Sequence, residues 1–323
     1  MDTSNIPSWL QTKWQALLQQ YRRNALPHAI LLTGKLGIGK SQLATQFFQW
    51  LHCSQHQEND EPCGHCRSCQ LMTANTHPDH YVINTETTIK IDHIRGLSNQ
   101  QALTPHLGLW KTSLITAADK MTTSAYNALL KLLEEPPPYR LFILTAAAME
   151  HIPVTIKSRC QHHAIVTPPI QIGRQWLHRH TQCDEQTLKT ALMLAGEVPQ
   201  QALQYIQTGR VEKITNLMHS FKNLQAAHAN IPLLAEQWQE SDIELMTTHI
   251  QRYCQQQLLN TDVADTRQYY LSLYNDVLTM KKQLLSRHNM NRLLIIENFM
   301  VTVMHKAPLF SATLGQDNHG NFS

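Results

Sequence analysis

Short apolar runs separated by amphipathic stretches dominate the first half of the chain. Runs of strand length occur at 29–32, 81–83, 114–115 and 141–144. Amphipathic segments that predict helices occur at 6–21, 41–51, 91–103 and 123–135. Pro136, Pro137 and Pro138 end the last of these helices, because proline cannot continue one. This alternation predicts an α/β fold with a mostly parallel sheet covered by helices.

The pattern changes near Val166. The segment 167–169, Thr-Pro-Pro, is typical of a linker, and from Ile170 onward the spacing of Leu, Met and Ile is helical. With 323 residues the chain exceeds the roughly 250–300 residues at which one core stops growing. The length favours two or three domains, and we place their bounds at 1–166, 167–208 and 209–323. The polar end of the chain after Lys306 is expected to be a mobile tail.

Composition excludes some classes of protein. With 42% hydrophobic and 16% charged residues, the chain is expected to fold and to be soluble. A formal net charge of +3 is too small to indicate a nucleic-acid-binding protein by itself. The N-terminus has an acid at Asp2 and lacks the apolar core of a signal peptide, and no uncharged apolar run approaches about 18–20 residues. We expect a cytoplasmic protein that does not enter a membrane.

The segment 34–41 matches the phosphate-binding pattern GxxxxGK[ST] between a predicted strand and a predicted helix. Gly34, Gly37 and Gly39 would let successive backbone amides turn toward one anionic group. Lys40 would reach the outer phosphates, and Ser41 would bind magnesium. The motif predicts an ATP and Mg²⁺ site, with a vestigial loop that binds nothing as the alternative.

Hydrolysis of ATP also needs acidic residues after a neighbouring strand, and in this sequence the first residues after that strand are not acidic. The strand at 114–115 is followed by Thr116 and Ala117, neither of which is a carboxylate. Asp119 comes later, and its use as the metal-binding acid is the alternative. A nucleotide could thus be held without being hydrolysed, which favours a structural or sensing role over an intrinsic ATPase.

Four of the seven cysteines lie close together, with the spacing Cx9CxxCxxC: Cys53, Cys63, Cys66 and Cys69. In a reducing cytosol, clustered thiols more often hold a metal than form disulfides. Four thiolates complete the tetrahedral coordination of a structural Zn²⁺. The nearby His52 and His65 are therefore not expected to bind the metal. A reduced metal-free loop, a redox pair and an iron–sulfur site are the alternatives.

Several segments resemble the clamp-loader branch of the AAA+ family, and they occur in the expected order: 26–34, 63–69, 76–79, 127–137 and 155–160. Residues 195–203 resemble the small lid domain of that family, and 289–299 faintly resemble its helical collar. The resemblance implies an AAA+ P-loop domain with a zinc-binding insertion at about 53–69, followed by a helical lid domain and an all-α collar domain.

The resemblance also changes the interpretation of Arg159. On the residues alone, an arginine in this polar stretch would be a surface residue. In this family the arginine of the Ser-Arg-Cys segment projects into the ATP site of the neighbouring subunit, so the resemblance implies that Arg159 is a trans-acting arginine finger.

Departures from the family's motor subunits are informative. Motor subunits have an Asp-Glu pair where this chain has Thr116 and Ala117, and a polar sensor where it has Ala146 and Ala147. Their lid arginine has no counterpart at 199–201. The resemblance therefore favours the stator over the motor.

The implied assembly is the bacterial DNA polymerase III clamp loader. In it, the chain would meet delta and gamma or tau subunits, the sliding clamp and primed DNA. The rival predictions are an active gamma/tau-like ATPase, a zinc-bearing P-loop nucleic-acid-binding module and a small-molecule P-loop kinase.

Overall fold

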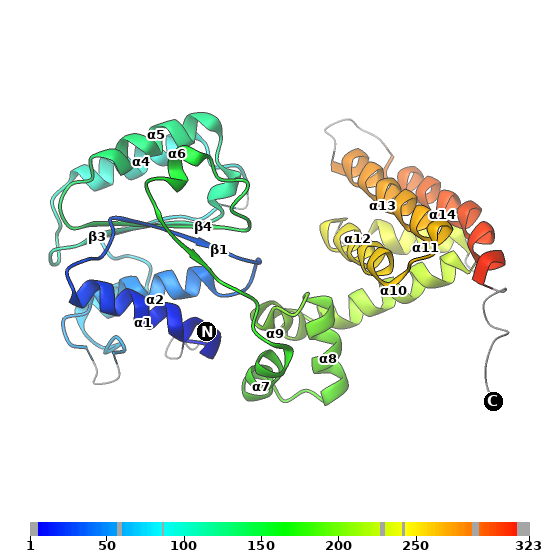
Figure 1. Cartoon of the computed structure of the whole chain (residues 1–323), viewed down its shortest axis with the longest axis horizontal. Coiled ribbons are helices and arrows are strands. Elements are labelled where there is room, and N and C mark those ends of the chain that lie inside the picture. The colour runs from blue at the N-terminus through cyan, green and yellow to red at the C-terminus, as the bar shows by residue number, and fades with distance from the viewer. Residues whose placement is uncertain are drawn as a thin grey trace. The chain divides into compact units, whose positions relative to one another are not determined.

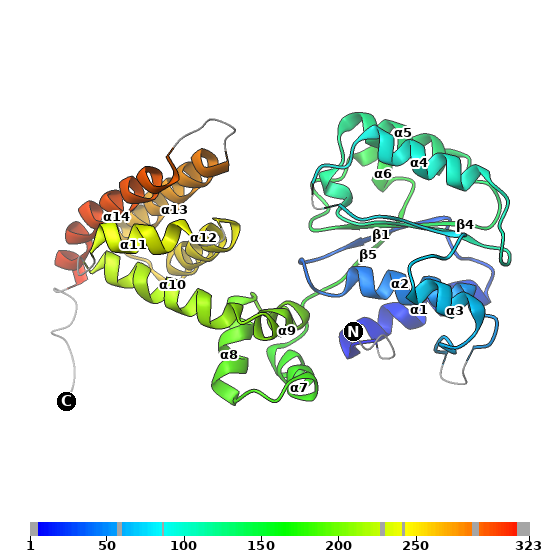
Figure 2. The same ribbon diagram turned by 180° about the vertical axis from the view of Figure 1, so that it is seen from behind.

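A computed structural model gives the fold of the chain (Figures 1 and 2). It describes residues 6–56, 60–85, 87–226, 230–240, 243–285 and 291–314. The chain divides into two compact units, residues 1–204 and 205–323. Within the described residues, no helix has both the length and the apolar character needed to cross a membrane.

The first unit is built on a parallel sheet of five strands in the order β2-β3-β4-β1-β5. The strands are β1 (Ala29–Thr33), β2 (His80–Ile83), β3 (Lys111–Ile115), β4 (Arg140–Ala146) and β5 (Gln161–Ala164). The central strand β1 pairs with β4 on one side and with β5 on the other. Because all pairs are parallel, the carboxyl ends of the strands meet at one edge of the sheet.

Helices cover both faces of this sheet (Figure 1). Their bounds are α1 (Gln11–Arg22), α2 (Lys40–His52), α3 (Arg67–Thr73), α4 (Ile91–Ala102), α5 (Thr123–Glu134) and α6 (Val154–Lys157). Ile30 and Leu32 of β1 pack with α1 and α2, whereas Leu31 packs with α4 and α5 on the other face. A strand buried on both faces explains the continuous apolar run in its sequence.

The predicted α/β class and parallel sheet are confirmed, and the observed strands contain the predicted apolar runs. Helix α5 begins where Thr122 caps it, since the Thr122 hydroxyl accepts a hydrogen bond from the amide of Ala125 (3.2 Å). It ends at Glu134, just before Pro136.

Three details differ from the prediction. The predicted helix at 6–21 is a 3-10 turn at Ser8–Leu10 followed by α1. Strand β5 was not predicted, because Gln161 and His162 are polar and exposed, so no apolar run marks it. Helix α3 was also not predicted, since it has only seven residues, directly follows Cys66 of the cysteine cluster and gives no clear helical period.

Three helices follow the sheet: α7 (Ile170–His180), α8 (Glu185–Leu194) and α9 (Pro199–Gln207). Gly173 of α7 lies so close to α9 that a Cβ added there would be 2.9 Å from Cγ of Pro199. Most of this segment belongs to the first compact unit, which ends at Gln204. A separate lid domain at 167–208 stays a prediction.

The second unit is helical in its described residues. Its helices are α10 (Arg210–Gln225), α11 (Ile231–Gln239), α12 (Ile243–Asn260), α13 (Ala264–Leu285) and α14 (Arg292–Leu314). They share a core that includes Phe221, Trp238, Ile250 and Leu273. Helix α14 continues to Leu314, so the tail was predicted to begin too early, at Lys306. The rest of the predicted tail, 315–323, lies outside the described residues.

Candidate functional site

The phosphate-binding motif forms a loop between β1 and α2, at the carboxyl edge of the sheet. Gly34, Gly37 and Gly39 have φ angles of 149°, 75° and 103°. At Gly37 and Gly39 these are conformations that a residue with a Cβ rarely adopts. Helix α2 begins at Lys40, and Ser41 on its first turn is exposed. The loop and helix start have the shape that presents backbone amides to a phosphate group.

The ammonium group of Lys40 finds its hydrogen-bond acceptors within the phosphate-binding loop. Its Nζ donates to the carbonyl oxygens of Gly34 (2.5 Å) and Lys35 (2.9 Å). Burial lowers the pKa of Lys40 to about 8, and the carboxylate of Asp119 partly opposes this shift. A phosphate group at this loop would have to take the place of these carbonyl contacts.

The carboxyl end of β4 lies next to the loop, that of β3 lies beyond it, and the residues that follow these two strands include few acidic groups. The Thr116 hydroxyl has two acceptors within hydrogen-bond distance, the carbonyl of Ile83 (3.1 Å) and Oδ1 of Asn84 (2.9 Å). Asp119, on a 3-10 turn at Ala118–Lys120, accepts the amide of Ala147 (3.2 Å). Asp119 is therefore the carboxylate that interacts electrostatically with Lys40, and it is already engaged with the loop after β4.

The start of α9 lies against the phosphate-binding loop. A Cβ added at Gly37 would be 3.0 Å from Cβ of Gln201, and one at Gly39 would be 3.2 Å from both side-chain amide atoms of Gln200. The Gln200 amide also donates to Oε1 of Gln42 on α2. Neutral amide side chains from the predicted lid thus face the loop.

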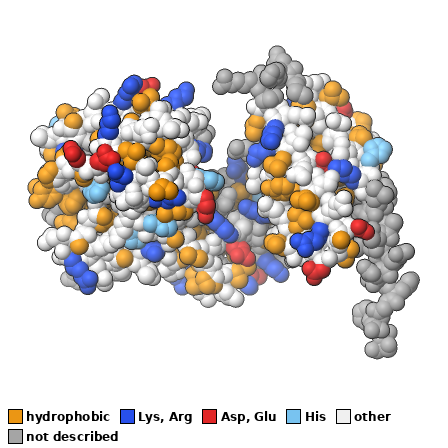
Figure 3. All heavy atoms as spheres, turned by 45° about the horizontal axis from the view of Figure 1, so that its top comes forward, with side chains coloured by type: hydrophobic (Ala, Val, Ile, Leu, Met, Phe, Trp, Pro, Cys, Tyr) orange, Lys and Arg blue, Asp and Glu red, His pale blue; other side chains and the backbone are white. Residues whose placement is uncertain are grey.

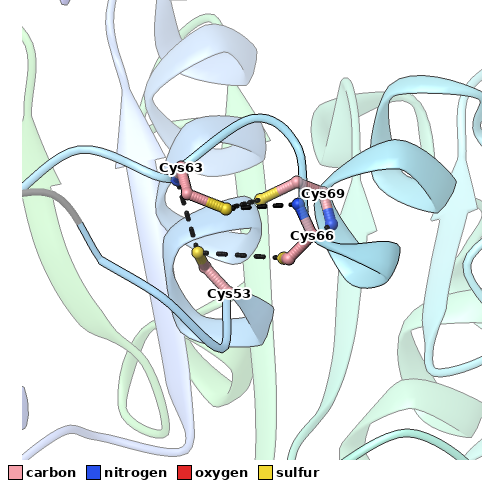
Figure 4. Close-up of side chains that lie close together, drawn as sticks. All are labelled: Cys53, Cys63, Cys66 and Cys69. Carbon is pink, nitrogen blue, oxygen red and sulfur yellow. Dashed lines mark hydrogen bonds between the residues drawn. The ribbon is translucent and has the colours of Figure 1, made fainter.

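The four predicted metal ligands come together between α2 and α3 (Figure 4). Their sulfur atoms all lie within 4.8 Å of one another, and the Cys63–Cys69 and Cys53–Cys66 sulfur pairs are both 4.0 Å apart. A tetrahedral Zn²⁺ with Zn–S bonds of about 2.3 Å needs S···S distances of about 3.8 Å. The described residues therefore fit a four-thiolate zinc site.

Backbone amides prepare the thiols for a metal. The amide of Cys63 donates to Sγ of Cys53, and the amide of Cys66 to Sγ of Cys63, both at 3.3 Å. Burial raises the pKa of Cys53 and of Cys69. At Cys66 burial acts the same way, but the backbone amides of Cys69 and Ser54 outweigh it and lower the pKa to about 6. A bound cation would stabilise the remaining thiolates.

His65 and His52, which were not expected to bind the metal, have other partners. His65 pairs through Nδ1 with the carbonyl of Cys63 (2.8 Å) and through Nε2 with Oε1 of Gln55 (3.2 Å). His52 is buried, and its Nε2 pairs with the hydroxyl of Thr112 on β3 (2.9 Å). Both rings are used in holding the segment in place.

Arg159 lies in the turn between α6 and β5. Its guanidinium donates to Oε1 of Glu134 (2.7 Å) and to the carbonyl of Thr155 (3.0 Å), and its side chain is 34% exposed. Gln161, two residues later, pairs with Ile30 near the amino end of β1. The phosphate-binding loop follows the other end of β1, so the two features lie at opposite edges of the sheet.

A buried ion pair in the first unit, between Asp79 and Lys111, was not predicted from the sequence. Asp79 accepts the amides of His106 and Leu107, and its Oδ1 lies 3.5 Å from Nζ of Lys111. Burial alone would raise the pKa of Asp79, but these groups outweigh it and hold the pKa below its usual value. The signal was the segment 76–79, which was recognised as a family segment but given no role.

Basic side chains do not form a stripe on the face of the first unit seen in Figure 3. Lys and Arg side chains are spread there among acidic, apolar and other polar ones. This agrees with the modest net charge of +3.

Comparisons with known proteins point to one family. A family model described as "DNA polymerase III, delta subunit" matches residues 9–168. The DNA polymerase III subunit delta' of Escherichia coli (strain K12) is 36% identical over 202 residues, which are 62% of this chain and 60% of that one. The subunit delta' of Pseudomonas aeruginosa is 31% identical over 325 residues, which cover 92% of this chain and 97% of the relative.

A solved structure supports the fold. The structure of a DNA polymerase III gamma subunit-related protein from Thermotoga maritima matches with a TM-score of 0.51 and 18% identity, covering 93% of this chain and all of that one. The predicted α/β fold with a parallel sheet is thus also found in a solved structure. Together with the match along nearly the whole Pseudomonas subunit, these findings show that the chain belongs to the DNA polymerase III subunit delta' family of clamp-loader proteins.

Proposed function

We propose that this chain is the stator subunit of a bacterial replicative clamp loader. In this role it supplies Arg159 to the ATP site of a neighbouring subunit and hydrolyses no ATP itself. Its partners are the gamma or tau and delta subunits, and the assembled complex loads the sliding clamp on primed DNA. The names of the relatives, DNA polymerase III subunit delta', support this assignment.

The position of Arg159 is the observation that carries the proposal. Residues Ile30 and Thr33 of β1 are about 10 Å apart, given the rise of a parallel strand. Arg159 lies beyond the Ile30 end, and Glu134 draws its guanidinium toward the amino edge of the sheet. A phosphate bound to the chain's own loop, beyond Thr33, is out of its reach. An arginine in this place can act only on a group brought by another molecule.

The surroundings of the phosphate-binding loop support a subunit that does not turn ATP over. Thr116 and Ala117 follow β3, and neither can bind Mg²⁺ as a carboxylate would. Gln200 and Gln201 face the loop and carry no charge with which to stabilise a leaving phosphate. The intact loop sequence is compatible with a bound nucleotide, which would then act structurally.

The four cysteines are proposed to hold a structural Zn²⁺. A bound Zn²⁺ would neutralise the buried thiolates and fix the turn between α2 and α3. With four protein ligands it has no open position for water or substrate, so it would take no part in chemistry.

The test is Arg159→Ala in a clamp-loader complex reconstituted with otherwise wild-type subunits. ATPase activity with primed DNA and clamp loading are measured for the complex and for the isolated chain. We expect the isolated chain to be inactive, and turnover at the neighbouring site to fall by about 10³-fold in the variant complex. Arg95→Ala is the matched control, since Arg95 is exposed and pairs with Asp92 on its own helix.

Two results would contradict the proposal. ATP turnover by the isolated chain at the rate of the complex would make it a motor subunit. A variant complex that assembles normally and keeps the wild-type rate would show that Arg159 does not act on a neighbouring site.

A further inference from the structure

Three hydrogen bonds hold the Arg159 guanidinium on one side. Its Nη2 donates to Oε1 of Glu134 (2.7 Å), and its Nη1 donates to the carbonyl of Thr155 (3.0 Å) and to Oγ of Ser158 (3.3 Å). Glu134 is the last residue of α5, whereas Thr155 belongs to α6. The guanidinium is therefore held between two separate helices.

These contacts leave part of the guanidinium available. It carries five N–H groups, and the three contacts made in the described part of the chain use three of them. The side chain is 34% exposed, so an acceptor can approach from solvent. The two remaining N–H groups are on Nε and Nη2, and the oxygens of a phosphate group can accept hydrogen bonds from them.

We propose that Glu134 is a positioning residue for Arg159. This inference rests on the proposed function, in which Arg159 reaches the phosphates of a nucleotide bound to the next subunit. Glu134 and the Thr155 carbonyl fix the guanidinium before that subunit arrives, so less side-chain freedom is lost when it meets the phosphate.

An exposed ion pair also has a plain interpretation, as a surface contact of little consequence. Such pairs stabilise a fold only weakly, because water screens them and both side chains lose freedom. Glu134 is 49% exposed, so this interpretation predicts no effect of its removal on either stability or activity. Our proposal also predicts unchanged stability but a clear loss of turnover in the complex, and activity therefore separates the two.

The experiment uses the full chain in the reconstituted clamp loader. Glu134→Ala is compared with Glu135→Ala, which removes an exposed carboxylate from the next position. We expect Glu134→Ala to lower kcat for ATP with primed DNA about five- to tenfold, with KM and assembly unchanged, because an arginine with free rotamers must be ordered at each turnover. Glu134→Gln keeps an acceptor oxygen, so its kcat should lie between those of Glu134→Ala and wild type. Glu135→Ala should match wild type.

A double variant tests whether Glu134 acts through Arg159. If it does, Glu134→Ala combined with Arg159→Ala should be no slower than Arg159→Ala alone. A further loss in the double variant would mean that Glu134 acts independently, and would overturn the proposal.

The remaining outcomes are separable. If Arg159→Ala slows the complex but Glu134→Ala does not, or if Glu134→Ala speeds it by releasing the arginine, this inference is wrong and the proposed function stands. If Arg159→Ala itself has no effect, the proposed function fails first. Thermal unfolding of each variant, expected to be unchanged, shows that the fold is intact.

Discussion

His249 on α12 shows how burial sets the behaviour of a single residue. The ring packs near Tyr205, with centroids 6.0 Å apart, and its Nε2 is buried without a hydrogen-bond partner among the described residues. Burial lowers the pKa of His249 to about 4, and the nearby charge of Arg252 adds to the effect. The folded chain therefore holds this ring neutral under conditions in which the unfolded chain would bind a proton.

The pH dependence of stability follows from this shift. The pKa of His249 is lower in the folded chain than the unfolded value of about 6.5. Its neutral ring therefore contributes fully to the free energy of unfolding above pH 6.5, and this contribution is lost as the pH falls toward 4. From pH 7.5 to 5.0 the loss due to His249 is about 2 kcal/mol. Urea unfolding at pH 7.5 and 5.0 should show a smaller pH dependence in His249→Gln than in wild type. The exposed His219→Gln should keep the wild-type dependence, and equal behaviour of both variants would refute the role of His249.

Single residues were predictable from the sequence only where a motif fixes their spacing. The loop residues from Gly34 to Ser41 and the four cysteines are near one another in the chain, so the pattern alone brought them together. The pairing of Arg159 with Glu134 joins residues 25 positions apart and depends on how α5 and α6 pack. Nothing in the local sequence of either residue shows it.

At the scale of elements, the segment that connects α2 to α3 has little apolar packing to hold its conformation. Cys66 caps α3, because its sulfur accepts the amide of Cys69. The sulfur cluster contacts few apolar side chains beyond its own members. A helix of seven residues is too short to be stable by itself. A metal ion would thus supply much of the order in this segment.

Removal of the metal should have a local effect. We expect one Zn²⁺ per purified chain, with no visible absorption of the kind an iron–sulfur cluster gives. After removal by a chelator, or in Cys66→Ser, amide hydrogen exchange should speed up in α3 while β1 and β4 stay protected. Cys183→Ser, outside the cluster, should keep both the metal and the protection. A metal-free chain with full protection in α3 would contradict the assignment.

Edge elements were harder to predict than central ones. Strands β1 and β4 are buried on both faces, so their apolar runs are plain in the sequence. Strand β5 lies at the edge of the sheet and is held by backbone pairing with β1, which leaves its side chains free to be polar. Backbone pairing leaves no periodic signal in such a sequence, which is why β5 was missed.

At the scale of the whole molecule, the second unit has a core of its own. Phe221, Trp238, Leu273 and Ile296 are buried together there. Trp238 is 2% exposed, and its indole N–H donates to Oγ of Ser220 (3.1 Å). A unit with a separate core can fold independently.

Residues 205–323 should therefore fold as a separate fragment. We expect a helical circular dichroism spectrum and cooperative unfolding in urea. Trp238→Ala should lower the free energy of unfolding by about 3–5 kcal/mol, because it leaves a large cavity. Leu259→Ala, at a position 85% exposed, should change it by less than about 0.5 kcal/mol. A fragment without cooperative unfolding would show that the second unit needs the first.

The placement of Arg159 and the phosphate-binding loop at opposite edges of one sheet gives the chain a polarity. Subunits with a donor at one edge and an acceptor at the other associate head to tail, through two different surfaces, and build rings or spirals. In such a row each member acts on the next and is acted on by the one before. In the proposed function this chain offers Arg159 to a neighbour but lacks the acidic residues of an ATPase site, so it would stand at one end of the row.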